Sequence, residues 1–354
     1  MSNKLDEANE WIAKAEKSLK TSLFHRKPDY DSAIEFYTKA ALIFRNAKEL
    51  PRAADLYIKI AEMNFQIGSF FHCAKNYETA SIIYKDLKEF QKMADLVTKA
   101  GRLLRENGTP DTASYVYEKA AKSLEQTLPE RAGEFYECSA EACEIEEKYH
   151  EAADQCNLAA RVWVRLRKIP EAERALRHYI EYIQKGNPNT IGATLEGLAD
   201  NSAVPKLSAR AVIVLILLKL YKEDEVAAGK ILNEAIERWR FNETEELRSV
   251  SCLLSAIDQG DGDGASQALK APCFRTLDLD YVRLLKDIKL PKPSEKNEGK
   301  VSSSLAPFSG QPEMGSGPLA GGPITASPAG EHGNSGAEGR GQEEEEEEEH
   351  ADIC

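Results

Sequence analysis

Residues 30–40 read YDSAIEFYTKA, and the same short phrase recurs until about residue 185: a cluster around an alanine, an aromatic residue three or four positions on, then another alanine. A second clear copy is residues 71–80 (FHCAKNYETA), and further copies begin at Pro110 and Pro129. The marker alanines follow a step of about twenty residues, at positions 33, 53 or 54, 74, 94, 113, 132, 152 and 172. Such a step accommodates a helix of about fifteen residues and a short turn.

The repeated phrase favours close packing of one helix on the next. Alanine lets two backbones approach, and the aromatic ring fills the groove one turn further on. A single helical hairpin cannot bury its apolar stripe, whereas stacked hairpins can. We therefore expect an all-α fold in which residues 1–188 form a right-handed solenoid of helical hairpins, similar to tetratricopeptide repeats. The alternative, an ordinary helical bundle with chance alanines, does not explain eight markers on one step.

The regular phrase fades across residues 189–206, which contain Gly192, Gly197 and Pro205. Beyond them, helices are predicted near 208–222, 225–240, 243–258, 264–270 and 278–290. We interpret residues 189–290 as a helical bundle that covers the apolar end of the solenoid. The longest apolar run, residues 211–218 (AVIVLILL), is too short to span a membrane and predicts a helix buried on all sides.

From residue 291 the composition changes to Gly, Pro, Ser, Ala and Glu, and we expect residues 291–354 to be a disordered acidic tail. Residues 292–354 hold thirteen acidic and four basic side chains, which leaves the preceding residues with −4 of the net charge of −13. A nearly balanced body argues against nucleic acid as a partner. We interpret the glutamates at 343–349 as an acidic tail. One interpretation of this tail is a solubilising extension.

The sequence carries no recognisable catalytic or cofactor motif: G-x-x-x-x-G-K-[ST], G-x-G-x-x-G and H-E-x-x-H are all absent. Six histidines are scattered without the spacing of metal ligands. The turn at residues 258–264 is similar to a calcium loop but has no glutamate at the twelfth position. We therefore expect no cofactor, no metal and no enzymatic activity.

Seven cysteines occur without a CxxC pair, which indicates buried free thiols in a reducing compartment rather than zinc sites or disulfides. The N-terminal residues 1–17 (MSNKLDEANEWIAKAEK) are charged throughout and lack the apolar segment of a secretory signal. A location in the cytoplasm, or at the cytosolic face of membranes, is the expectation that follows.

A loop with the sequence LFHRKP follows the first predicted helix, residues 4–22. It places Leu23 and Phe24 next to Arg26 and Lys27. At a membrane surface, the apolar pair would insert while the cations meet anionic headgroups. Alternatively, the apolar pair folds back on the next helix as a hydrophobic staple. The residues alone leave both interpretations open.

Basic residues gather in the fifth, sixth and eighth predicted helices: Lys99, Arg102, Arg105, Lys119, Lys122, Arg161, Arg165, Arg167 and Lys168. Arg161 and Arg165 are four positions apart and share one helix face. These residues form either an ordinary solvated surface or, if they gather on one side of the solenoid, a stripe suited to an acidic helical partner.

Four phrases of the sequence resemble the soluble NSF attachment protein (SNAP) family and look most like its gamma branch. They are residues 14–17 (KAEK), 27–33 (KPDYDSA), 71–78 (FHCAKNYE) and 106–113 (ENGTPDTA), of which the last is the most specific. The resemblance covers residues 1 to about 290, and the acidic tail ending in cysteine is also similar to the gamma branch, although longer.

The resemblance implies an adaptor that wraps a syntaxin-type SNARE four-helix bundle with a concave basic face, in several copies per bundle. The C-terminal bundle would recruit the ATPase NSF, which pulls the SNARE complex apart in vesicle transport and membrane fusion. The loop with Leu23, Phe24, Arg26 and Lys27 would then touch the membrane peripherally. A general repeat scaffold that binds a different helical partner without NSF is the alternative.

The resemblance also implies two sets of site residues, of which the SNARE-facing set is drawn from the basic residues named above. The candidates for the SNARE-binding face are Lys99, Arg102, Arg105, Lys119, Lys122, Arg161 and Arg165. The candidates for contact with NSF are Glu223, Asp224, Asp258, Asp261, Asp263, Leu284 and Leu285.

Overall fold

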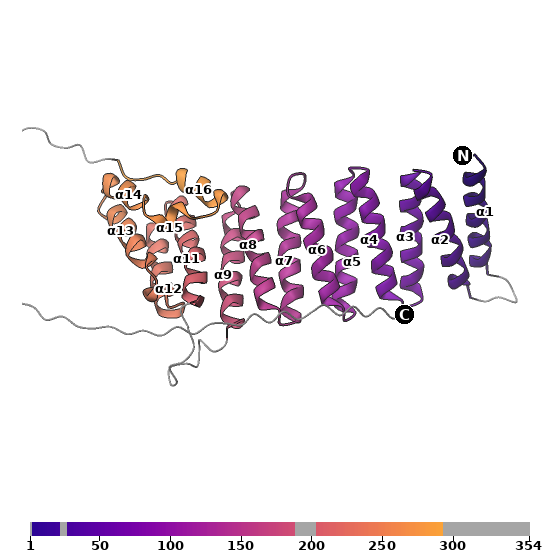
Figure 1. The fold of residues 1–354 in the computed structure, drawn as a ribbon, viewed down its shortest axis with the longest axis horizontal. Helices are drawn as coiled ribbons and strands as arrows, with labels where there is room; N and C mark the ends of the chain where they lie inside the picture. The colour runs from indigo at the N-terminus through magenta and orange to yellow at the C-terminus, as the bar shows by residue number, and fades with distance from the viewer. Residues whose placement is uncertain (1, 22–26, 188–202, 293–354) are drawn as a thin grey trace, which may run out of the picture. The chain divides into compact units, whose positions relative to one another are not determined.

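The computed structural model describes residues 2–21, 27–187 and 203–292, and all regular structure in these ranges is helical (Figure 1). The first helices are α1 (Ser2–Leu19), α2 (Tyr30–Asn46), α3 (Leu50–Gln66), α4 (Phe70–Asp86), α5 (Phe90–Glu106), α6 (Pro110–Leu124), α7 (Pro129–Ile145), α8 (Tyr149–Arg165) and α9 (Ile169–Lys185). From α2 to α9 each helix begins 19 or 20 residues after the previous one. The expected step of about twenty residues, and the all-α hairpin solenoid, are therefore confirmed.

Small residues let the helices of the stack approach closely. Every marker alanine is fully buried, and α1 to α9 pack in sequence order, each on its neighbour. A Cβ atom on Gly101 in α5 would lie 2.3 Å from Cζ of Tyr117 in α6. A Cβ atom on Gly133 in α7 would lie 2.7 Å from Cε2 of Trp163 in α8. At these two positions an aromatic ring rests directly on a neighbouring helix backbone, which only glycine allows.

Most of the described turns between successive helices of the stack share one conformation, in which one residue has a positive φ. Lys48, Gly68 and Lys88 each adopt a positive φ, of 65°, 76° and 61°, two residues after a helix ends. In the first of these turns the N–H of Glu49 donates to the carbonyl of Phe44 at 2.9 Å. This is the hydrogen bond of a Schellman motif, which satisfies a helix-terminal carbonyl and reverses the chain. The same turn in successive hairpins gives the stack its regular geometry.

Ion pairs connect alternate helices of the stack, so the helices form two rows. Lys119 in α6 reaches Glu78 in α4 at 3.9 Å, whereas Arg105 in α5 reaches Glu141 in α7 at 2.7 Å. The even-numbered helices therefore form one row and the odd-numbered helices the other. The helices alternate in direction, so the ends of α1, α3, α5 and α7 meet the starts of α2, α4, α6 and α8 along one edge. We call this the lower edge, after its place in Figure 1.

The remaining helices are α11 (Ala203–Tyr221), α12 (Glu225–Arg238), the 3₁₀ turn η1 (Phe241–Glu243), α13 (Glu246–Asp258), α14 (Gly262–Ala268), α15 (Pro272–Arg275) and α16 (Leu279–Lys286). Five of them match the helices predicted from the sequence. The turn η1 and helix α15 were not predicted, because three or four residues are too few to show a helical period. The last helix ends at Lys286, four residues earlier than expected.

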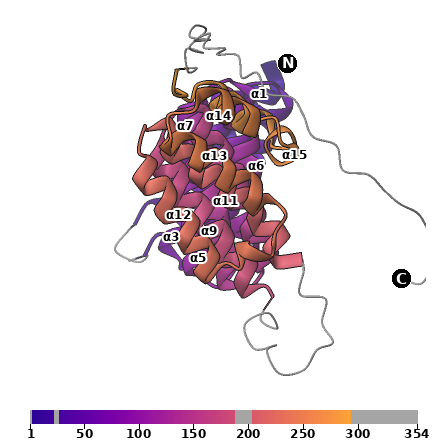
Figure 2. The ribbon, with the colours of Figure 1, turned by 90° about the vertical axis from the view of Figure 1, so that its left-hand side faces the viewer.

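Helix α11 is the centre of this C-terminal part. It packs on α9, α12 and α16, and each residue from Ala211 to Leu218 is buried. The predicted helix buried on all sides is therefore confirmed. Helix α16 contacts both α8 and α11, so the last helix returns to the solenoid (Figure 1). Figure 2 shows the C-terminal part from its outer end, with α11, α12 and α13 in front of the stack. Across the described ranges, none of the helices is long and apolar enough to cross a membrane.

The described helices belong to one compact unit, Met1–Lys296. The expected boundary between residues 188 and 189 falls in the segment 188–202, and the tail from residue 293 onward also lies outside the described residues. The proposed domain boundaries therefore stay predictions.

Candidate partner-binding surfaces

Acidic side chains of the C-terminal part surround a cleft of about 400 Å³. Two turns and the end of the described chain form it, with the lining residues Leu220, Glu223, Glu225, Ile257, Asp258, Gly260, Ile288, Lys289, Leu290 and Pro291. Two of the predicted NSF-contact residues, Glu223 and Asp258, thus lie in one cleft, although 35 positions separate them in the sequence. Both are exposed to solvent and open to a partner.

The other acidic candidates lie beside this cleft, at the N-termini of α12 and α14. Asp224 accepts a hydrogen bond from the N–H of Ala227 at 2.9 Å and so begins α12. Asp261 accepts one from the N–H of Gly264 at 2.9 Å and so begins α14. A carboxylate is favoured at such a position because it faces the positive end of the helix dipole. Asp263, in the first turn of α14, is exposed.

The end of the described chain is packed against α14. A Cβ atom on Gly262 would lie 2.2 Å from the carbonyl oxygen of Pro291, so the close approach requires glycine here. Lys289 pairs with Glu223 at 2.6 Å, and this ion pair raises the pKa of the lysine. The last residues of the unit therefore form one wall of the acidic cleft.

The two leucine candidates in α16 differ in accessibility. Leu284 is completely buried, and Leu285 is partly buried. Leu284 packs in the core and has no surface to offer a partner in this arrangement. Sequence periodicity marked the apolar side of this helix but did not distinguish the side chain that packs inward from its neighbour.

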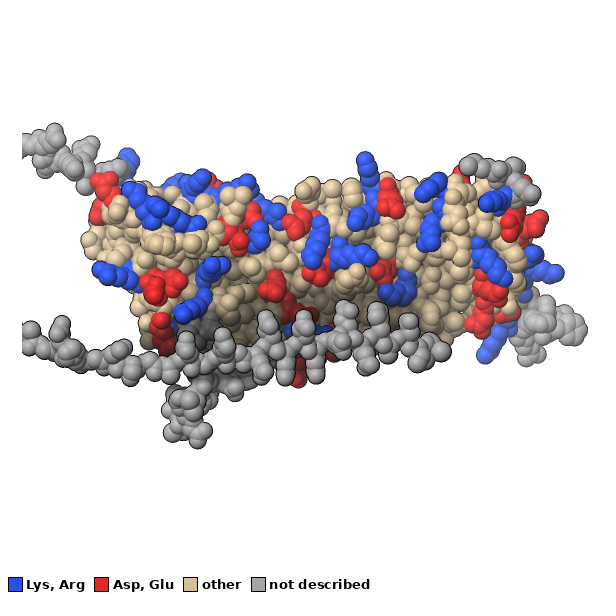
Figure 3. All heavy atoms as spheres, viewed as in Figure 1, with Lys and Arg blue, Asp and Glu red and all other residues tan. Residues whose placement is uncertain are grey.

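The basic candidates come from helices of both rows: Lys99, Arg102 and Arg105 from α5, Lys119 and Lys122 from α6, and Arg161 and Arg165 from α8. On the face shown in Figure 3, lysine and arginine alternate with aspartate and glutamate, with no continuous stripe of one sign. The candidates are therefore distributed over three helices, α5, α6 and α8, and the face in Figure 3 shows no single block of positive charge.

Most of these bases already have a carboxylate partner. The ion pairs are Arg102–Glu106 (2.8 Å), Arg105–Glu141 (2.7 Å), Lys122–Glu118 (2.7 Å), Lys119–Glu78 (3.9 Å) and Arg165–Glu125 (2.7 Å). Ion pairs exposed to water contribute little to stability, so such bases can exchange their partner for a carboxylate of another protein. Lys99 forms no ion pair within the part of the chain described, and its Nζ lies 5.6 Å from the ring centroid of Tyr77.

Arg161 and Arg165 also hold the last helix. Nε of Arg161 lies 3.3 Å from Oδ2 of Asp280 in α16, and Nε of Arg165 lies 3.9 Å from the same atom. The Asp280 side chain is only 7% exposed. In the next position Tyr281 donates a hydrogen bond to Oδ1 of Asn157 in α8, at 3.3 Å, and burial raises the pKa of this tyrosine. No sequence pattern predicted this contact between Asp280 and the two arginines, because α8 and α16 are far apart along the chain.

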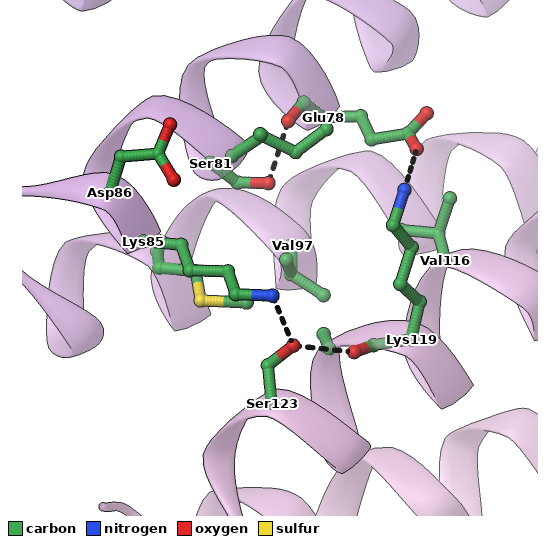
Figure 4. A pocket seen from close by; sticks show the side chains of 11 residues that line it. Glu78, Ser81, Lys85, Asp86, Val97, Val116, Lys119 and Ser123 are labelled. Atoms are coloured by element: carbon green, nitrogen blue, oxygen red, sulfur yellow. Dashed lines mark hydrogen bonds and ion pairs between the residues drawn. The ribbon is translucent and has the colours of Figure 1, made fainter. Parts of the chain in front are cut away.

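A small hollow opens between α4, α5 and α6, with a volume of about 130 Å³ (Figure 4). Lys85 donates to Oγ of Ser123 at 3.0 Å on one side, and Lys119 faces Glu78 on the other. Val97 and Val116 are among its apolar lining residues. Small-molecule pockets in proteins typically have about 300–1,000 Å³, so this hollow is smaller than a typical ligand site.

The predicted membrane loop lies mainly outside the described residues, and this holds for Leu23, Phe24 and Arg26. Lys27 is described and exposed at the lower edge, as is Lys20 on the other side of the loop.

The family model described as "Soluble NSF attachment protein, SNAP" matches residues 6–289, from α1 to the end of α16. The chain belongs to the SNAP family. The match includes the basic helices of the stack and most of the residues that line the acidic cleft. The membership expected from the four sequence phrases, and the likeness to the gamma branch, are confirmed.

Three curated relatives illustrate the similarity to the SNAP family. A gamma-soluble NSF attachment protein of Arabidopsis thaliana is 27% identical over 280 residues, which cover 79% of this chain and 90% of the relative. One of Dictyostelium discoideum is 27% identical over 293 residues, covering 83% and 86%. An alpha-soluble NSF attachment protein of Vitis vinifera is 27% identical over 279 residues, covering 76% and 88%.

Proposed function

We propose that this chain is an adaptor that binds SNARE complexes and recruits the ATPase NSF, which then disassembles them during vesicle transport. The match to the SNAP family over residues 6–289 carries the proposal, since the two gamma relatives and the alpha relative are attachment proteins for NSF by name. The adaptor supplies surfaces, and the bound ATPase supplies the energy.

The acidic cleft is the surface proposed for NSF. Glu223 and Asp258 line it, while Asp224, Asp261 and Asp263 lie at the adjoining helix starts. Five carboxylates on neighbouring turns create a local negative potential, and charged surfaces of this kind steer a basic partner and select its orientation. Leu285 is the apolar candidate at this end, because Leu284 is buried.

The exposed bases of α5 and α6 are the surface proposed for the SNARE bundle. Lys99, Lys119 and Lys122 are exposed, and their ion pairs are weak or absent. Arg102 and Arg105 in the last turns of α5 are further candidates, although each faces a glutamate. Arg161 and Arg165 contribute less freely, because Asp280 holds them. Several copies around one syntaxin-type bundle would add their individually modest contacts.

Contact with the membrane completes the proposal. The loop with Leu23, Phe24, Arg26 and Lys27 would place the adaptor peripherally on the cytosolic face of a membrane, next to membrane-anchored SNAREs. Apolar insertion and attraction to anionic lipid would act together there.

A pull-down on immobilised SNARE complex tests the proposal. We expect NSF locked in its ATP state to be retained only when the chain is present. Lys99→Glu combined with Lys122→Glu should weaken retention of the chain itself. Glu223→Lys combined with Asp258→Lys should leave retention of the chain unchanged and abolish retention of NSF. If the unmodified chain is retained on the SNARE complex but NSF is not, the chain is instead a general helical-repeat scaffold.

A further inference from the structure

The turn between α3 and α4 exposes an apolar cluster at the lower edge. Phe65, Ile67 and Phe71 are 49%, 42% and 44% exposed. Ten large apolar side chains are exposed among the described residues, and three of them lie at this one turn, so they form a patch. The ring of Phe70, which is partly buried, lies 5.4 Å from that of Phe65, edge to face.

The chemistry of the turn suits an apolar environment. Residues 65–72 read FQIGSFFH and contain no acidic side chain. Their backbone donors are satisfied within the turn: N–H of Ile67 to the carbonyl of Met63 at 3.1 Å, N–H of Gly68 to that of Phe65 at 3.1 Å, and N–H of Ser69 to that of Asn64 at 2.8 Å. Oγ of Ser69 lies 3.0 Å from Nδ1 of His72. Entering the edge of a bilayer would therefore leave few of its polar groups unsatisfied.

Basic residues lie beside the turn on the same edge. Arg52 of α3 donates to Oδ1 of Asn9 of α1 at 2.6 Å, so these two helices lie side by side. They run in the same direction, and the end of α1 therefore lies beside the end of α3. Lys20, which follows α1, and Lys27, which precedes α2, are both exposed there. An apolar tip beside lysines is typical of proteins that bind anionic membrane surfaces.

The neighbouring turns of the lower edge are different. The turn between α5 and α6 reads ENGTPD from Glu106 to Asp111, and the turn between α7 and α8 contains Glu146 and Glu147. Carboxylates at these two turns oppose insertion next to anionic lipid. The apolar, non-acidic character is thus confined, among these described turns, to the one nearest α1.

We propose that the α3–α4 turn is a second membrane-inserting element, whose ligand is an anionic lipid surface. Phe65, Ile67 and Phe71 enter the interface between headgroups and acyl chains, while Lys20 and Lys27 remain at headgroup level. The inference rests on the proposed function in one respect, because the lower edge also carries the loop proposed to meet the membrane. Two insertion points on one edge would fix the orientation of the solenoid on the bilayer, which a single loop cannot do.

A protein partner is the other possible occupant, and the geometry favours lipid. The patch projects from a turn at the edge of the stack, whereas helical partners dock in grooves lined by several elements.

Flotation with vesicles of phosphatidylcholine and phosphatidylserine tests the inference. The full chain with Phe65→Ser, Ile67→Ser and Phe71→Ser should bind about tenfold less at limiting lipid, since three large side chains lose their transfer free energy. Its binding to soluble SNARE complex should be unchanged. The matched control is Leu42→Ser with Ile82→Ser, two apolar residues 40% and 41% exposed on α2 and α4, toward the opposite edge. That variant should float like the original chain.

Three outcomes with the variants would overturn the inference: undiminished flotation of the triple variant, equal loss in the control, or loss of soluble SNARE binding with flotation intact. The last outcome identifies a protein site. Absence of flotation for the original chain also contradicts the inference. The proposed function is tested separately, by the retention of NSF on soluble SNARE complex, which needs no membrane.

A second measurement does not depend on removing side chains. Phe71→Trp places a fluorophore in the patch, and vesicles with brominated acyl chains should quench its emission beyond the signal of the original chain. Unquenched emission in the presence of bound vesicles would contradict insertion of this turn.

Discussion

Nε of Arg161 in α8 lies 3.3 Å from Oδ2 of Asp280 in α16, across 119 positions of the sequence. The contact joins a helix of the stack to the last helix of the unit. Arg161 is a residue proposed to face the SNARE bundle. Helix α16 leads into the acidic cleft proposed for NSF. A partner that attracted Arg161 away from Asp280 would therefore loosen the helix next to the other partner's surface.

Asp280→Asn should weaken the attachment of α16. The carboxylate is 7% exposed and faces Arg161, Arg165 and Arg283. Losing its charge removes the carboxylate partner of Arg161 and Arg283 and one of the two partners of Arg165, so we expect the free energy of unfolding to fall by about 1–3 kcal/mol. Chemical denaturation measures the change, and hydrogen exchange should be faster in residues 279–286.

Asp287→Asn is the matched control on the same helix. Asp287 pairs with Arg167, but its side chain is 50% exposed, so the change should cost less than about 1 kcal/mol. Equal losses in the two variants would contradict the clamp at Asp280.

Gly101→Ala and Gly133→Ala test the close packing of the stack. The added Cβ would lie 2.3 Å from the Tyr117 ring and 2.7 Å from the Trp163 ring, so each ring must shift within a packed core. We expect each variant to lose about 1–3 kcal/mol of unfolding free energy, and thermal melting measures this loss.

Gly229→Ala is the control for these two glycines. It lies within α12, and nothing lies within 4 Å of the Cβ it would gain. Replacing an unhindered helix glycine should raise stability by about 0.5–1 kcal/mol. Similar effects at all three positions would show that the rings do not rest on the backbone of α5 and α7.

The pattern of alanines and aromatics was enough to predict the stack, because every helix buries the same kind of stripe against its neighbours. The run at residues 211–218 likewise predicted a fully buried helix, since no face of it is polar. The grouping of Glu223 with Asp258 in one cleft depends on how α12 and α14 are placed, which periodicity does not encode. The pairing of Arg161 with Asp280 was missed for the same reason: it is a contact between distant segments.

Stability should decline at acidic pH because carboxylates of the stack have lowered pKa values. A hydrogen bond from Lys122 lowers the pKa of Glu118. Hydrogen bonds from Lys185 and Tyr182 lower the pKa of Glu144. Burial raises the pKa of Glu125, but the bonds from Tyr136 and Arg165 outweigh it and the pKa is lowered. Since the folded values lie below the ordinary value of 4.5, their stabilisation is complete above it and is lost as the pH falls further.

Melting temperatures measured between neutral and acidic pH check this dependence. They should fall below about pH 4.5, and Glu125→Gln should make the fall shallower. A chain whose melting temperature is unchanged far below that pH would contradict these ion pairs.

The cysteines should differ in reactivity. Sequence spacing predicted buried thiols, and Cys73, Cys143 and Cys156 are buried, whereas Cys252 is exposed and the expectation is wrong for it. Burial raises the pKa of Cys73 to about 11, which suppresses its reactive thiolate near neutral pH.

Alkylation with N-ethylmaleimide, followed by mass spectrometry of peptides, measures this order. In a chain with Cys354→Ser, which removes a thiol outside the described residues, Cys252 should react first. Cys73 should react only after denaturation. Early labelling of Cys73 would show that α4 opens in the native state.

The ATP-driven disassembly of purified SNARE complex by NSF tests the adaptor account most directly. With the chain added, the account predicts release of SNARE subunits that needs ATP hydrolysis, and a strongly reduced rate for Glu223→Lys with Asp258→Lys. A SNARE complex that stays intact with NSF, ATP and the unmodified chain all present would contradict it.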